Sequence, residues 1–266
     1  GGLAPAVWCC AAFAPAGRGG RRGATPQLAA LSSGHLCVIE LTGGGAAGGA
    51  PSSSRRTHSL PGLAQLTCLA YTACGSWIVC GSEDGHIQVW GAQSLTLERN
   101  LVGEGARRCF ATSPPEAEYE PRLIAGGSDS SLQVWSTPGW ALERVVVDPP
   151  SGRAAIHSCS FSASGTWLVS VGKHFCVWRA CLDHRGLLDL CLHQRLEGAC
   201  GAIGLRAVAI RAQDDFIAVG SCDGLLGVWI REEGPPPPRD PAPEASPEAE
   251  RHPLRHGRTC PLPGQR

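Results

Sequence analysis

Residues 81–90 read GSEDGHIQVW and residues 126–135 read GGSDSSLQVW, so nearly the same ten letters occur twice in one chain. Both copies close on Gln-Val-Trp, and two further Val-Trp pairs follow. A fixed spacing of forty-odd residues is the sequence signature of a repeat architecture. The pairs end at Trp90, Trp135, Trp178 and Trp229.

Each copy predicts a β-hairpin, because two short alternating runs flank a polar turn that contains glycine. Three of the turns carry an aspartate, namely Asp84, Asp129 and Asp223. The copy at 168–178 is shorter in its turn and has no aspartate there. A fifth, degenerate copy lies at 27–39, where Ile39 replaces the tryptophan.

Further strands flank each hairpin. Upstream, residues 66–77 and 156–167 match position for position, and 8–17 and 207–216 fit the same template more loosely. Downstream, LERNL at 97–101 and LERVV at 142–146 supply a fourth strand. One unit is therefore four strands. A single sheet of this size cannot bury both of its faces, whereas units packed radially bury one another.

These residues resemble the WD-repeat β-propeller family over about residues 7–230. The resemblance implies an all-β propeller of four-stranded antiparallel blades, about five of them visible, forming an incomplete part of a seven-bladed ring. The chain departs from the family pattern, since no Asp follows any of the four tryptophans and no Gly-His precedes a first strand. Without that histidine, we expect the turn aspartates to cap their own backbone amides. The expected units are about 7–42, 63–102, 106–148, 154–197 and 203–230.

The segments between and after these units are expected to lie outside the sheets. We expect 42–62 to be a flexible loop and 113–121 to be an insertion within one blade. Residues 231–266 are rich in Pro, Glu, Arg and Ser and are predicted to be a disordered tail. The last unit then lacks its fourth strand. In the family, that strand often comes from the N-terminal end of the domain, so we expect one to three further blades upstream.

The amino-acid composition indicates which classes of partner and which cellular compartment to expect. Lys+Arg and Asp+Glu both number 23 in 266 residues, which argues against a nucleic-acid partner. No apolar run is long enough to span a membrane. Many of the 14 cysteines lie within apolar runs, as free thiols do in a reducing compartment. The expected location is cytoplasmic, and a nuclear one stays open.

Catalytic chemistry is not indicated. The chain contains no GxxxxGK[ST], HExxH or GxSxG motif. Ligand-type residues do gather at Cys181, His184, Cys191 and His193. A structural zinc site needs four such side chains to converge, and we favour ordinary packing here. We therefore predict no catalytic residue, cofactor or metal.

One short motif suggests a specific partner. The segment RTHSLP at 56–61 places Arg56 before Ser59 and Pro61 after it, which resembles a docking site for 14-3-3 proteins once Ser59 is phosphorylated. A dianionic phosphate can be clamped by basic side chains. A solvated linker is the alternative. Among the tryptophans, Trp140 is the one that we expect to be exposed.

Three functions remain open. The first is a non-catalytic interaction scaffold, which is what the resemblance implies. The second is a regulatory or targeting propeller of a larger signalling enzyme, such as a kinase or a small-GTPase exchange factor. The third is a substrate receptor of a cullin-type ubiquitin ligase. It is disfavoured, because no Val-Trp pair is followed by the Asp-x-Arg that such receptors commonly carry.

Overall fold

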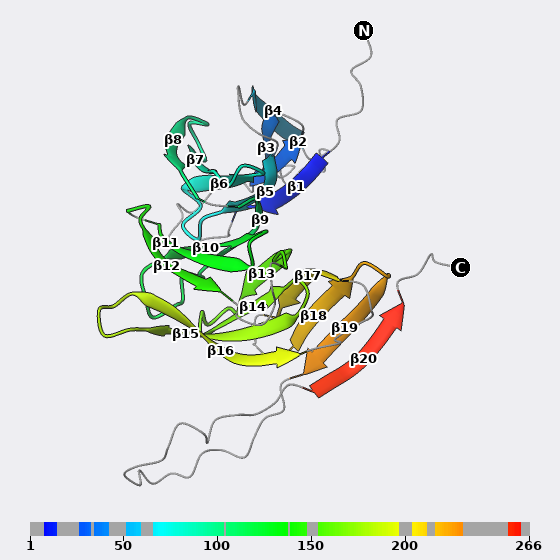
Figure 1. Cartoon of the computed structure of the whole chain (residues 1–266). Coiled ribbons are helices and arrows are strands. Elements are labelled where there is room, and N and C mark those ends of the chain that lie inside the picture. Colours follow the sequence, from blue (N-terminus) through cyan, green and yellow to red (C-terminus); the bar gives the residue numbers. More distant parts are fainter. Residues whose placement is uncertain are drawn as a thin grey trace.

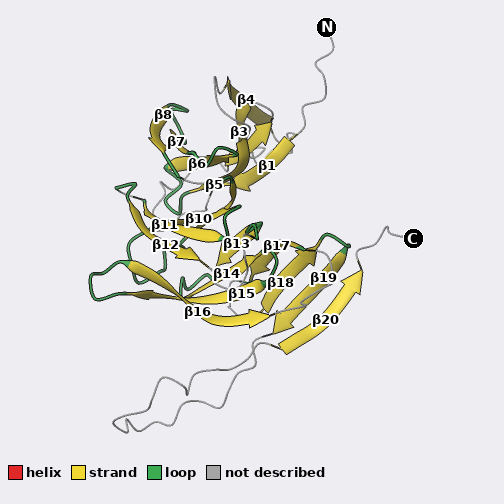
Figure 2. Ribbon diagram, in the orientation of Figure 1, coloured by secondary structure: helices red, strands yellow, loops and turns green. Residues whose placement is uncertain are grey.

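The computed structural model contains strands and turns and, within the residues that it describes, no helix (Figure 2). The described residues are 8–14, 27–32, 35–42, 52–59, 66–103, 105–137, 139–147, 154–196, 204–211, 216–230 and 255–261. The strands form five sheets of four antiparallel strands each. The predicted fold class, a propeller of four-stranded antiparallel blades, is confirmed.

We number the sheets as blades 1 to 5 in chain order (Figure 1). Blade 1 comprises β1 (Trp8–Phe13), β2 (Gln27–Ser32), β3 (His35–Thr42) and β4 (Ser52–Ser59). Blade 2 comprises β5 (Leu66–Tyr71), β6 (Trp77–Ser82), β7 (Ile87–Gly91) and β8 (Leu97–Leu101). Blade 3 comprises β9 (Arg107–Thr112), β10 (Arg122–Gly127), β11 (Ser131–Ser136) and β12 (Leu142–Val147). Blade 4 comprises β13 (Ser158–Phe161), β14 (Trp167–Val171), β15 (Phe175–Leu182) and β16 (Leu188–Leu196). Blade 5 comprises β17 (Leu205–Ile210), β18 (Phe216–Ser221), β19 (Leu225–Ile230) and β20 (Arg255–Pro261).

Two outer strands correct the domain prediction. β4 lies inside the segment 42–62, which was expected to be a loop, and β20 lies inside 231–266, which was expected to be disordered. β4 pairs with β3 and β20 pairs with β19. Blade 5 thus takes its fourth strand from downstream rather than from an N-terminal segment. An outer strand pairs through backbone groups, so a polar segment with little apolar character can fill this place.

The blades follow one another along an arc (Figure 1). The first strand of each blade is the innermost, and β1, β5, β9, β13 and β17 contact each other in succession. These strands line the concave side, while β8, β12, β16 and β20 lie on the outside. The concave side is therefore built from one strand of every blade.

The core lies between the blades rather than within any one of them. Four buried clusters fill the four junctions between consecutive blades. Each of the repeat tryptophans belongs to one of these clusters and faces the preceding blade: Trp90 at the junction of blades 1 and 2, Trp135 at 2 and 3, Trp178 at 3 and 4, and Trp229 at 4 and 5. Radial packing thus buries faces that one small sheet would leave in water.

Glycine at the end of β6 and of β10 allows this close packing. A Cβ on Gly81 would lie 2.6 Å from the Cβ of Arg107 in the next blade. A Cβ on Gly126 would lie 2.5 Å from the Sγ of Cys109 and 3.0 Å from the Cγ2 of Ile156. The repeated glycine before the turn is required by contact, because no side chain fits between the sheets at these two points.

Candidate interaction surface

The turn aspartates hold the β-hairpins from within. The Asp84 carboxylate accepts hydrogen bonds from the Ser82 hydroxyl and from the backbone amide of His86, the latter at 3.2 Å. These contacts, the Ser82 hydroxyl first, lower the pKa of Asp84. Asp129 accepts from the amide of Ser131 at 3.1 Å and from its hydroxyl at 2.7 Å. The predicted capping of backbone amides is confirmed at Asp84 and Asp129.

Asp223 shows a related contact, since its carboxylate accepts a hydrogen bond from the Ser221 hydroxyl. Blade 4 has no aspartate in this turn, and there the Gly172 amide donates to the His174 carbonyl at 3.1 Å. All three aspartates therefore stabilise turns of their own blades, and we assign them no role in ligand binding.

The tryptophans are packing residues. Trp90, Trp135, Trp178 and Trp229 are all buried. The Trp178 indole N–H donates to Ser170 Oγ at 2.8 Å, and that of Trp90 donates to Gln88 Oε1 at 3.2 Å. The Trp135 indole nitrogen is fully buried and has no hydrogen-bond partner within the described part of the chain. A partner protein cannot reach any of these rings.

Trp140 was expected to be exposed, and this prediction is wrong. The side chain is only 8% exposed and belongs to the cluster between blades 2 and 3. Its ring meets Trp77 edge to face, with the ring centroids 5.6 Å apart. The connection between β11 and β12 folds back onto the blade junction, where a large aromatic surface is buried with favourable geometry.

The phosphorylation motif lies on the outer strand of blade 1. Arg56 pairs with Val38, and Ser59 pairs with His35 at the end of β4. Pro61 lies outside the described residues. The motif therefore belongs to a paired strand over most of its length, and not to the loop that the sequence predicted.

The four cysteine and histidine residues of blade 4 do not converge. The Sγ atoms of Cys181 and Cys191 lie 3.7 Å apart. His193 instead packs against Trp167, with the ring centroids 4.9 Å apart, and His184 Nε2 accepts a hydrogen bond from Arg185. Within the described ranges, no group of three or more His, Cys, Asp or Glu side chains is arranged to hold a metal ion.

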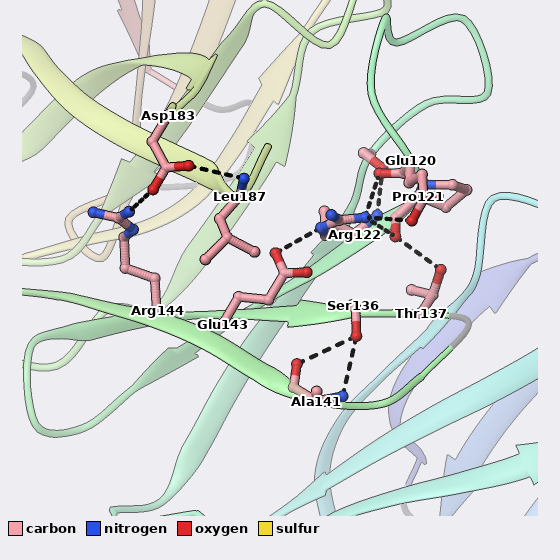
Figure 3. A network of polar contacts seen from close by, with 11 residues as sticks. Glu120, Pro121, Arg122, Ser136, Thr137, Ala141, Glu143, Arg144, Asp183 and Leu187 are labelled. Atoms are coloured by element: carbon pink, nitrogen blue, oxygen red, sulfur yellow. Dashed lines mark hydrogen bonds and ion pairs between the residues drawn. The ribbon is translucent and has the colours of Figure 1, made fainter. Parts of the chain in front are cut away.

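A polar network that the sequence did not reveal joins blades 3 and 4 at the outer side (Figure 3). On blade 3, Arg122 Nε lies 2.7 Å from the Glu143 carboxylate, and both side chains are more than nine-tenths buried. Arg144 of β12 contacts two carboxylates of the β15–β16 hairpin, Asp183 at 2.7 Å and Asp189 at 3.3 Å. The amide of Leu187, and next that of Arg185, lower the pKa of Asp183. Charge pairing thus fixes the long hairpin of blade 4 to its neighbour.

The insertion at 113–121 also joins these blades. The prediction that it separates the first and second strands of its blade is confirmed, because it connects β9 to β10. The Tyr119 hydroxyl donates to the Gly165 carbonyl of blade 4 at 2.7 Å, and burial raises the pKa of this phenol. The outer side therefore serves to hold the blades in place.

Exposed side chains recur at one position of the innermost strands. In β5, β9 and β17 the pairing with the second strand is interrupted at one residue, which is Thr67, Arg108 and Arg206 respectively. His157 occupies the same place directly before β13, where its amide donates to the Val171 carbonyl at 2.8 Å. An irregularity of this kind re-aims a side chain. Arg108 and Arg206 are exposed, and Thr67 and His157 are half-buried.

We call these four residues the inner-strand position. They come from blades 2, 3, 4 and 5 in order. Three lie on the innermost strands and His157 directly precedes one, and these strands contact each other in sequence. The Thr67 hydroxyl donates to the backbone carbonyls of Gly81 and Arg107, so at this position it is the exposed side chains of Arg108 and Arg206 that a partner can reach at the concave side. No sequence motif marked it, because one unpaired residue in a short strand carries no distinctive pattern.

Within the part of the chain that the structure describes, no helix is long and apolar enough to cross a membrane.

Comparison with known proteins agrees with the geometry. Residues 54–91 match the family model "WD domain, G-beta repeat". No curated protein matches the sequence. The match covers most of β4 together with β5, β6 and β7, so the matched segment spans parts of two blades.

Solved structures share the fold at low identity. One chain of the structure of ctPRC2 in complex with H3K27me3 and H3K27M is 18% identical, with a TM-score of 0.71, over 96% of this chain and 59% of that one. A chain of the Chaetomium thermophilum Polycomb Repressive Complex 2 bound to GSK126 is 17% identical, with a TM-score of 0.68. This match covers 94% of this chain and 57% of that one. A chain of an active polycomb repressive complex 2 in the basal state is 17% identical, with a TM-score of 0.68, and the match covers 96% of this chain and 59% of that one. The present sequence thus spans less than two thirds of these chains. With five four-stranded blades, the chain is a β-propeller, and its residues 54–91 match the WD-repeat model.

Proposed function

We propose that this protein is a non-catalytic interaction scaffold whose partner proteins bind on the concave side of the arc. The observation that carries the proposal is the inner-strand position. Blades 3, 4 and 5 present Arg108, His157 and Arg206 from adjacent strands or directly before them, while the repeat tryptophans are buried between the blades. A rigid surface with reachable polar side chains binds a partner without a large ordering cost.

The test compares two variants of equal charge. Arg108→Ala/Arg206→Ala removes the exposed arginines of the concave side. Arg99→Ala/Arg185→Ala removes two exposed arginines from β8 and from the β15–β16 turn. Each full-length variant is used for affinity capture with quantitative mass spectrometry. We expect specific partners of the wild-type protein to be lost from the first variant and kept by the second. Identical partner sets for the two variants would contradict the assignment of the concave side.

A 14-3-3 protein remains a proposed partner at phosphorylated Ser59. Arg56 and Ser59 lie on β4, an outer strand that only β3 holds through backbone pairing. Binding therefore requires the end of β4 to separate from β3 before the segment enters a phosphopeptide groove. An outer strand is the one that can separate without opening the rest of the sheet.

Ser59→Ala and Ser53→Ala provide the comparison, since both change a serine of the same strand. After treatment with a basophilic kinase, we expect a purified 14-3-3 protein to bind the wild-type chain and the Ser53→Ala variant. We expect it not to bind the Ser59→Ala variant. Equal binding by all three would exclude Ser59 as the docking site.

We also propose a reducing, cytoplasmic location. Its support is the burial of free thiols in the blade interior, where burial raises the pKa of Cys68 and Cys80. Protonated, buried thiols behave as small apolar side chains. Fractionation of cells that express a tagged full-length protein tests the location, and recovery from the secreted fraction would refute it.

A further inference from the structure

We infer that the inner-strand position of blades 3, 4 and 5 is a binding site for an acidic peptide segment of a partner protein, recognised through Arg108, His157 and Arg206. The inference rests on the proposed scaffold function and specifies the chemistry of the partner. Three consecutive blades contribute cationic or titratable side chains at the same place, in a chain whose net charge is zero. The local excess of positive charge is therefore not a consequence of composition.

Two of the three side chains are in contact, and the third, Arg108, lies on β9, the strand that packs against β13. Nη1 of Arg206 is 3.0 Å from a ring nitrogen of His157. Burial, followed by the charges of Arg206 and Arg108, lowers the pKa of His157. From the strands that flank it, then, His157 faces arginine on both sides: Arg108 on β9 and Arg206 on β17. No carboxylate contributes to this shift.

Arg206 is held in position before any ligand arrives. Its Nε donates to Cys222 Sγ at 2.8 Å, and its Nη1 contacts His157. Neither Arg206 nor the exposed Arg108 forms an ion pair within the described part of the chain. Arg144, which also contacts blade 4, differs from them because it has two carboxylate partners, Asp183 and Asp189. Guanidinium groups that are oriented and unneutralised are suited to bind carboxylates in a bidentate manner.

The same geometry favours a peptide over a nucleic acid. Proteins that bind single strands combine a basic groove with aromatic side chains on which the bases stack. The inner-strand position consists of Thr67, Arg108, His157 and Arg206 and includes no Phe, Tyr or Trp on which a base could stack. An extended peptide with several Asp or Glu residues can instead follow the adjacent innermost strands and place one carboxylate at each blade.

Binding should be linked to the protonation of His157. A bound carboxylate favours the charged imidazolium, so complex formation takes up a proton and raises the pKa of His157. In the free protein, burial and then the charges of Arg206 and Arg108 lower this pKa. Because the pKa of His157 in the free protein is lowered from the ordinary histidine value, affinity should increase as the pH falls below about 6.5.

The experiment uses the full chain and a fluorescently labelled hexaglutamate peptide, with binding measured by anisotropy at low ionic strength. We expect saturable binding that weakens with salt. Arg108→Ala and Arg206→Ala should each weaken it on the order of tenfold, whereas Arg108→Lys should restore part of the loss and Arg99→Ala should leave affinity unchanged. His157→Gln should remove the dependence on pH. Thermal unfolding of every variant controls for folding.

Three results would overturn the inference: no saturable binding of the peptide, equal binding by Arg99→Ala and Arg206→Ala, or tighter binding of a labelled hexathymidine than of hexaglutamate through the same arginines. The scaffold proposal has its own readout. If the Arg108→Ala/Arg206→Ala variant loses cellular partners but hexaglutamate does not bind, the acidic specificity is wrong and the concave interaction surface stands. If peptide binding depends on the arginines but the captured partners do not change, the site exists and the proposed scaffold surface is wrong.

Discussion

Replacing Gly126 with alanine tests the blade packing directly. The added Cβ would lie 2.5 Å from Cys109 Sγ and 3.0 Å from Ile156 Cγ2, and both of these side chains are buried. Overpacking of this kind typically costs about 1–3 kcal/mol. The loss of chain entropy in the unfolded state offsets about 0.4–1 kcal/mol of that cost. We therefore expect Gly126→Ala to reduce the free energy of unfolding by about 1–2 kcal/mol.

Gly220 is the matched control, because it occupies the equivalent place in blade 5, before the turn of β18 and β19. A Cβ there would approach only Ala207 Cβ, at 3.8 Å, which is ordinary contact. The unfolded-state effect then acts alone, and Gly220→Ala should stabilise the protein by about 0.4–1 kcal/mol. The same substitution thus has opposite signs in blades 3 and 5.

Urea unfolding followed by tryptophan fluorescence measures both variants, since neither change removes a fluorophore, and equal m-values allow the midpoints to be compared. Cys109→Ala should cost less in the Gly126→Ala background than alone, because it removes the sulfur that the new Cβ meets. A Gly126→Ala variant as stable as Gly220→Ala would refute the argument that close contact with Cys109 of the same blade and with Ile156 next to blade 4 requires this glycine.

Three further predictions follow from the same packing. Trp178→Phe should cost about 1–2 kcal/mol more than Trp135→Phe in urea midpoints followed by far-UV circular dichroism, because only the Trp178 indole has a hydrogen-bond partner to lose; equal losses would contradict it. Trp90→Ala should reduce the free energy of unfolding by about 3–5 kcal/mol, and a loss under about 1 kcal/mol would mean that the ring does not fill the junction. A chain ending at Ile230 lacks β20 and exposes the edge of β19, so light scattering should detect concentration-dependent association that the full chain does not show.

The inner strands, hairpins and their packing could be predicted from the sequence because each depends on local pattern. The alternation of apolar and polar residues indicates the strands, and the spacing of Trp90 and Trp135 gives the length of a blade. β4 and β20 could not be predicted in this way. Their residues are mostly polar, and each strand is held by pairing with the edge of a neighbouring strand, which composition does not reveal.

The candidate site was harder to predict than the fold. Arg108, His157 and Arg206 lie about fifty residues apart in the chain and share no motif, and only the packing of successive innermost strands brings them together. The converse holds for the turn aspartates, which a motif identified at once and which the structure places in hairpin turns. Exposure of Trp140 was predicted wrongly because the connection that carries it folds back towards Trp77.

The matched segment 54–91 begins in the outer strand of one blade and ends in the third strand of the next. A gene segment of this phase, duplicated in tandem, makes every copy finish the sheet of its predecessor. Adding a further copy to such an array leaves no unpaired strand edge between the blades, so each added copy is compatible with folding. A blade that is not followed by another copy needs a fourth strand from another segment, and in blade 5 residues 255–261 provide it.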